Sequence, residues 1–137
     1  MNIQLDALLS AIPLERRAAD VPFSAEVFVQ HNGLAPTDYL EAFARYRGGA
    51  GDVGAAYLDL WEPDEVKEAN ADYEVAAYAP GFTVFASDGG DTAYAFKRDS
   101  GDIYAFPFIG MTMDEPATFL SSTLEGFLVK LAVEDND

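Results

Sequence analysis

The 137-residue chain has no cysteine, one histidine, and 8 lysines and arginines against 24 aspartates and glutamates, for a formal net charge of -16. The absence of cysteine excludes disulfides, thiolate metal sites and cysteine nucleophiles, and it favours a reducing compartment such as the cytoplasm. The shortage of positive charge argues against nucleic acid and anionic membranes as partners, because both carry negative charge. A basic partner is favoured instead, since the same field speeds its approach.

Long apolar runs are also missing. No stretch approaches the ~20 residues that cross a bilayer, and the first residues lack the basic segment that precedes the apolar part of a secretory signal. We therefore expect a soluble cytoplasmic protein that does not bind membranes. Half of the residues are nevertheless hydrophobic and 13% are aromatic. At this length, that composition predicts one folded domain covering residues 1–137.

Helices are expected where apolar residues recur at helical spacing. The first opens the chain and ends at Pro13, whose ring is incompatible with a helix interior. A second has Pro36 at its first position and ends at the Gly48-Gly49 pair. A third begins at Pro63, and acidic residues fill its first turns, where they favour the positive end of the helix dipole.

The last helix follows Ser122, which forms a capping-box pattern with Glu125 three residues later. Its buried stripe is predicted to contain Leu124, Phe127, Leu128 and Leu131.

Strands are expected where apolar and polar residues alternate, or where β-branched and aromatic residues gather. The predicted strands cover residues 21–29, 53–61, 82–87, 92–97 and 102–109. The last three are joined by short turns rich in Asp and Gly, which predicts a three-stranded antiparallel meander. Helices near both termini with a mainly antiparallel sheet between them indicate an α+β fold.

Several short segments follow one another in a definite order over residues 25–131. They are Ala35-Pro36-Thr37-Asp38-Tyr39-Leu40-Glu41-Ala42-Phe43, Gly48-Gly49, Leu60-Trp61-Glu62-Pro63, Asn70, Tyr73, Phe85-Ala86-Ser87-Asp88-Gly89-Gly90, Ala93-Tyr94-Ala95-Phe96 and Ser122-Thr123-Leu124-Glu125-Gly126-Phe127-Leu128. This succession resembles the SUKH superfamily, which includes yeast cell-wall regulators and bacterial immunity proteins that neutralise polymorphic toxins. The resemblance implies a domain that binds another protein, and it implies a structural role for Asp88 and Gly89.

Between Asp59 and Glu74 the chain carries seven acids against the single base Lys67. A charge run of this kind is most often a solvated helix face. The alternative is a docking surface for a basic partner, with carboxylates as charge partners and with Trp61 as an aromatic anchor if its side chain is exposed. The residues predicted to bind the partner are Asp59, Trp61, Glu62, Asp64, Glu65 and Glu68.

Other candidate sites have simpler explanations. The turns Asp88-Gly89-Gly90-Asp91 and Asp99-Ser100-Gly101-Asp102 offer carboxylates to a hard cation such as calcium, but Asp-Gly is also the ordinary hairpin turn. His31 stands beside Asn32-Gly33 in a predicted surface turn, without the positioned neighbour that acid–base catalysis needs. The aromatic residues of the meander recur every second position and are expected in the core rather than in a pocket. We expect no metal, no cofactor and no catalytic residue.

Charge and resemblance together predict a non-catalytic binding module: an immunity protein that sequesters a basic toxin domain, for example a nuclease. One alternative is a regulatory scaffold that binds an endogenous partner, and a more remote one is a small hydrolase or cation-binding protein. The acidic composition is also common in salt-loving organisms, where it needs no partner.

Overall fold

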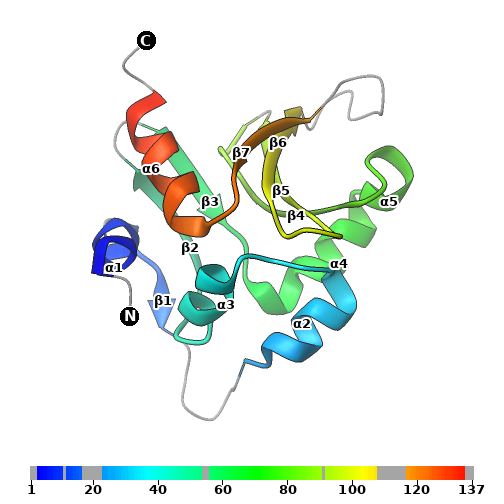
Figure 1. Ribbon diagram of the computed structural model, residues 1–137, viewed down its shortest axis with the longest axis horizontal. Coiled ribbons are helices and arrows are strands. Elements are labelled where there is room, and N and C mark those ends of the chain that lie inside the picture. The colour runs from blue at the N-terminus through cyan, green and yellow to red at the C-terminus, as the bar shows by residue number, and fades with distance from the viewer. Residues whose placement is uncertain are drawn as a thin grey trace.

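The computed structural model describes residues 3–10, 12–16, 23–53, 56–90, 92–107 and 117–134. Its elements are α1 (Ile3–Ser10), β1 (Glu15–Arg16), α2 (Ala25–Asn32), α3 (Thr37–Phe43), β2 (Tyr46–Val53), β3 (Ala56–Leu60), α4 (Pro63–Asp72), α5 (Val75–Tyr78), β4 (Phe82–Ser87), β5 (Thr92–Lys97), β6 (Ile103–Pro107), β7 (Thr118–Ser121) and α6 (Leu124–Glu134). Helices near both termini pack against the strands between them, which confirms the α+β class (Figure 1). Within the described residues, every helix is too short or too polar to cross a membrane.

The strands form one sheet in which each strand is antiparallel to the next in chain order, from β1 to β7. The predicted meander is confirmed as β4, β5 and β6, and the bounds of β4 and β5 agree with the predicted ones. Strands β3 and β4 pair over two positions only, Asp59 with Ser87 and Leu60 with Ala86. The β2–β3 hairpin therefore diverges from the curved β4–β7 part of the sheet (Figure 1).

Helix α6 closes one face of this sheet. All four residues of its predicted apolar stripe are buried. The helix begins at Leu124, and its cap differs from the predicted box at Ser122. Thr123 Oγ1 accepts a hydrogen bond from the Gly126 N–H at 3.0 Å, and the Asp38 carboxylate of α3 accepts from the N–H groups of Leu124 and Glu125 at 2.8 and 2.9 Å. A carboxylate from another helix thus satisfies the free N–H groups of α6.

The strand predicted over residues 21–29 is wrong. Residues 21–22 lie outside the described part, and the rest of the segment enters helix α2. Ser24 Oγ accepts the Val27 N–H at 3.2 Å, which is the N-cap geometry that starts a helix. Phe28 is then buried on the inner face against Tyr39, at 5.6 Å between ring centroids. His31 accordingly lies in the last turn of α2 and not in a surface turn.

The Gly48-Gly49 pair does not end a helix. Helix α3 ends at Phe43, and both glycines lie in β2, which was not predicted. A Cβ at Gly48 would lie 2.9 Å from the Leu60 carbonyl oxygen, and one at Gly51 would lie 2.6 Å from Pro13 Cδ. Glycine is needed in this strand because neighbouring chain passes too close for a side chain.

Two further predicted strands agree with the structure only in part. The range 53–61 joins the end of β2 to β3, with residues 54–55 outside the described part. The predicted strand 102–109 is described as β6 up to Pro107, and residues 108–109 are also outside it. The short elements α5 and β7 were not predicted.

Helix α4 begins at Pro63 as predicted. Its orientation is fixed by Asn70, whose side-chain amide donates to the Val84 carbonyl and accepts the Val84 N–H, each at 2.8 Å. The side chain therefore pairs with β4 as a neighbouring strand would. Because Val66, one turn earlier, is fully buried, the two flanks of α4 face different neighbours.

Candidate functional site

The six residues predicted to bind a partner do not share one surface. Helix α4 stands between two pockets, and its two flanks divide the six residues. The hairpin pocket, between α4 and the β2–β3 hairpin, is lined by Asp59, Trp61, Glu62 and Glu65. The interhelical pocket, between α4 and α2, is lined by the remaining two, Asp64 and Glu68.

The hairpin pocket has a volume of about 420 Å³. Asp59 points to the outer face of β3, because its neighbours Leu58 and Leu60 point into the core. Facing it, Gly48 on β2 and Ala69 on α4 present little or no side chain. The pocket therefore exists because small residues surround the carboxylate.

One wall of the hairpin pocket is aromatic. Trp61 is half-buried and packs against the core. Its ring stacks on Tyr73 at the end of α4, with centroids 5.9 Å apart and an interplanar angle of 15°. Tyr73 is 52% exposed. Tyr73 was not predicted as a site residue, although its spacing of two turns from Glu65 already places both on one side of the helix.

The rim of the hairpin pocket contains a base that was not predicted. Arg47 on β2 pairs with Glu62, with 2.6 Å between Nη2 and Oε1. No signal in the sequence links these two residues, since tertiary structure brings them together. The Glu62 carboxylate in turn raises the pKa of Glu65, first by hydrogen bonding and then by repulsion, while Arg47 opposes this shift. Negative charge therefore exceeds positive charge at this rim.

Asp59 is half-buried, whereas Glu65 is exposed. Burial raises the pKa of Asp59, because the charged form is less well solvated there. None of the described residues that line the pocket is basic. The arrangement favours a cation that brings positive charge to the pocket from outside.

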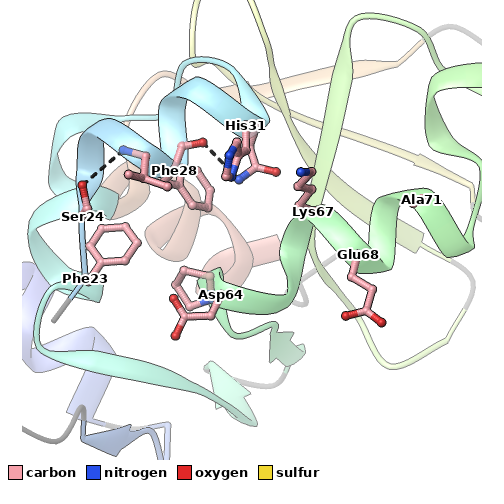
Figure 2. Close-up of a pocket in the computed structure, with 11 residues that line it drawn as sticks. Phe23, Ser24, Phe28, His31, Asp64, Lys67, Glu68 and Ala71 are labelled. Atoms are coloured by element: carbon pink, nitrogen blue, oxygen red, sulfur yellow. Dashed lines mark hydrogen bonds between the residues drawn. The ribbon is translucent and has the colours of Figure 1, made fainter. Parts of the chain in front are cut away.

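The interhelical pocket is larger, at about 630 Å³, and has a different character. Its floor is apolar, because Phe28 is only 4% exposed and Pro63 is also buried. Figure 2 shows His31 and Lys67 near each other at one end, with Asp64 at the other end and Glu68 pointing away from α2. Charges of both signs surround this pocket, so it does not favour a cation.

The Asp88 carboxylate has structural partners within its own turn. Asp88 Oδ1 accepts the N–H groups of Gly90 and Thr92 at 2.9 and 3.1 Å. Gly89 adopts a φ of +82°, and a Cβ there would meet the ring of Tyr57. Asp91 lies outside the described residues, and within them no group of three or more His, Cys, Asp or Glu side chains could hold a metal ion.

The expectation that the aromatic residues of the meander form core is confirmed for most of them. Phe85 and Phe96 stack at 4.0 Å and are fully buried. Tyr94 and Phe106 are also buried, whereas Phe82 and Tyr104 are half-buried. Phe108 lies outside the described residues.

Comparison with known proteins adds no family to this geometry. Neither a scan against protein-family models nor a search of curated proteins finds a match for the chain.

Proposed function

We propose that this protein is a non-catalytic binding module of the immunity type, which sequesters a basic toxin domain at the hairpin pocket and its rim. The observation that carries the proposal is a pocket lined by Trp61 and by the carboxylates of Asp59, Glu62 and Glu65. The half-exposed Tyr73 stacks on the tryptophan ring. Aromatic residues beside charged groups are typical of the few residues that dominate binding energy at protein interfaces. The resemblance to the SUKH superfamily supports the same function.

The proposed mechanism needs no chemical step. The net charge of -16 attracts a basic surface over long range and raises the rate of encounter. The exposed carboxylates orient the partner, and the aromatic stack provides the apolar contact that slows its dissociation. A nuclease fits this description, because the face that must attract phosphate is basic and would be covered by the complex.

Capture from an extract of the source organism tests the proposal. The immobilised protein is expected to retain a basic protein at low salt and to lose it as salt rises, since exposed charge pairs are screened within about 10 Å at 0.1 M. A toxicity assay then asks whether co-expression of this protein protects cells from the captured one. Capture that is indifferent to salt, or a captured protein whose toxicity is not relieved, would contradict the proposal.

The double variant Glu62→Lys and Glu65→Lys sharpens the same experiment. It is expected to lose the captured protein at a salt concentration that the wild type withstands. The matched control is Glu41→Lys with Asp52→Lys, which changes the net charge equally at exposed positions of α3 and β2. Equal losses in both variants would show that net charge alone, rather than this surface, holds the partner.

A further inference from the structure

We infer that the hairpin pocket receives one arginine side chain of the partner, with its guanidinium beside Trp61 and the carboxylates of Asp59 and Glu65. The inference rests on the proposed function, because it names the group that the partner inserts into the same surface.

The shape of the pocket favours a single long side chain. Its volume of about 420 Å³ lies within the range of about 300–1,000 Å³ that small-ligand pockets cover. Gly48, Gly49 and Ala69 keep it open, since none of them fills the space. A larger residue does not fit at position 48, because its Cβ would lie only 2.9 Å from the Leu60 carbonyl oxygen.

The charges of the pocket favour a cation. Glu62 is engaged by Arg47, so the pair supplies little further attraction. Burial disfavours the charged form of Asp59, and a hydrogen bond with Glu62, followed by repulsion from it, disfavours the charged form of Glu65. A positive group placed between Asp59 and Glu65 stabilises both charges.

The aromatic wall distinguishes arginine from lysine. A guanidinium is planar, stacks on aromatic rings and donates to carboxylates in a two-pronged geometry, whereas an ammonium is a compact and strongly hydrated charge. Tryptophan is the aromatic residue that best attracts a cation, and Trp61 lines the same pocket as Asp59, whose carboxylate gives the acceptor. An arginine therefore uses both features at once.

Trp61 also makes the inference measurable, because it is the single tryptophan of the chain. The probe is a blocked Gly-Arg-Gly peptide, with Gly-Lys-Gly and the neutral isostere Gly-citrulline-Gly as comparisons. We expect a saturable change in tryptophan fluorescence with the arginine peptide at up to about 10 mM, binding about fivefold weaker with lysine, and no saturation with citrulline. Equal responses to all three peptides, or no saturable response to the arginine peptide, would overturn the inference.

Variants assign the response to the pocket. Asp59→Asn with Glu65→Gln is expected to abolish the preference for arginine over citrulline, whereas Glu41→Gln with Asp52→Asn is expected to keep it. Preference that survives in the first variant would also overturn the inference. The peptide assay requires no natural partner, so its failure leaves salt-sensitive capture and protection of cells intact, and failure of those leaves the peptide result intact.

Discussion

The two flanks of α4 carry acidic residues from the same short stretch of sequence, yet they form different surfaces. Toward the β2–β3 hairpin, carboxylates and Trp61 line a pocket together with glycine and alanine, and Tyr73 stacks on Trp61. Toward α2, acids alternate with His31 and Lys67 over a floor that belongs to the core. Density of charge along a chain is therefore a poor guide to density in space, because a helix distributes neighbouring residues around its axis.

The floor of the interhelical pocket provides the largest expected effect. Phe28→Ala removes a buried ring that contacts Tyr39 and Phe96. We expect the free energy of unfolding to fall by about 4 kcal/mol, from lost burial and the cavity left behind. Urea unfolding measures this. A loss below about 0.5 kcal/mol, the size typical of a surface residue, would show that this flank is not structural and would contradict the contrast between the pockets.

Detaching α4 from the sheet should disturb both pockets together. Asn70→Ala leaves the Val84 N–H and carbonyl without their side-chain partners at a largely buried position. The expected cost is about 3 kcal/mol, since each unsatisfied buried group costs about 1–3 kcal/mol. Asp72→Ala, exposed on the same helix, is the control and should stay within about 0.5 kcal/mol of the wild type. Similar urea midpoints for the two variants would contradict the anchoring role of Asn70.

Elements whose cause lies within a few residues could be predicted from the sequence, and elements whose cause lies far along the chain could not. The β4–β5–β6 meander was predictable because its turns depend on residues such as Asp88 and Gly89 that act within the turn itself. Helix α2 was mispredicted because the cap at Ser24 outweighed the strand preference of its valines. The glycines of β2 were mispredicted because their reason, the nearby backbone of Leu60, is remote in sequence.

The site shows the same division. That Asp59 faces the opposite side from its neighbours in β3 followed from strand alternation, and the helix start at Pro63 followed from its residue type. The separation of Asp64 from Glu65 depends on which face of α4 is buried. The ion pair of Arg47 with Glu62 depends on the β2–β3 hairpin, so no local pattern indicates it.

The aromatic stack distinguishes the flanks by a moderate effect. Tyr73→Ala removes the ring that packs on Trp61 and is expected to lower the free energy of unfolding by about 1 kcal/mol. Val27→Ala removes a 47% exposed side chain at the interhelical pocket. It should change the free energy of unfolding by less than about 0.5 kcal/mol. Thermal unfolding of both variants decides this. If Val27→Ala lowered the free energy of unfolding more than Tyr73→Ala does, the Trp61–Tyr73 stack would not be the more stabilising apolar contact of the two flanks.

The smallest expected effect concerns pH. Because burial raises the pKa of Asp59, the folded state disfavours its charged form, and this penalty is fully present above the folded pKa. Asp59→Asn should therefore melt at a slightly higher temperature than the wild type at about pH 7, and the gain should disappear as pH falls below the ordinary carboxylate range of about 4. Asp64→Asn, which removes a charge favourable at the start of α4, should lower the melting temperature slightly. A gain for Asp59→Asn that persists at low pH would contradict burial as the cause.

The central claim is that the hairpin flank of α4, and not the acidic composition as a whole, binds a basic partner. Its most direct test is the association rate of a captured basic protein with two double variants of equal charge, Glu62→Lys with Glu65→Lys and Asp64→Lys with Glu68→Lys. We expect Glu62→Lys with Glu65→Lys to slow association about tenfold. Asp64→Lys with Glu68→Lys should slow it only about twofold, because that variant changes the long-range attraction but not the binding surface. Equal rates for the two variants would contradict the claim.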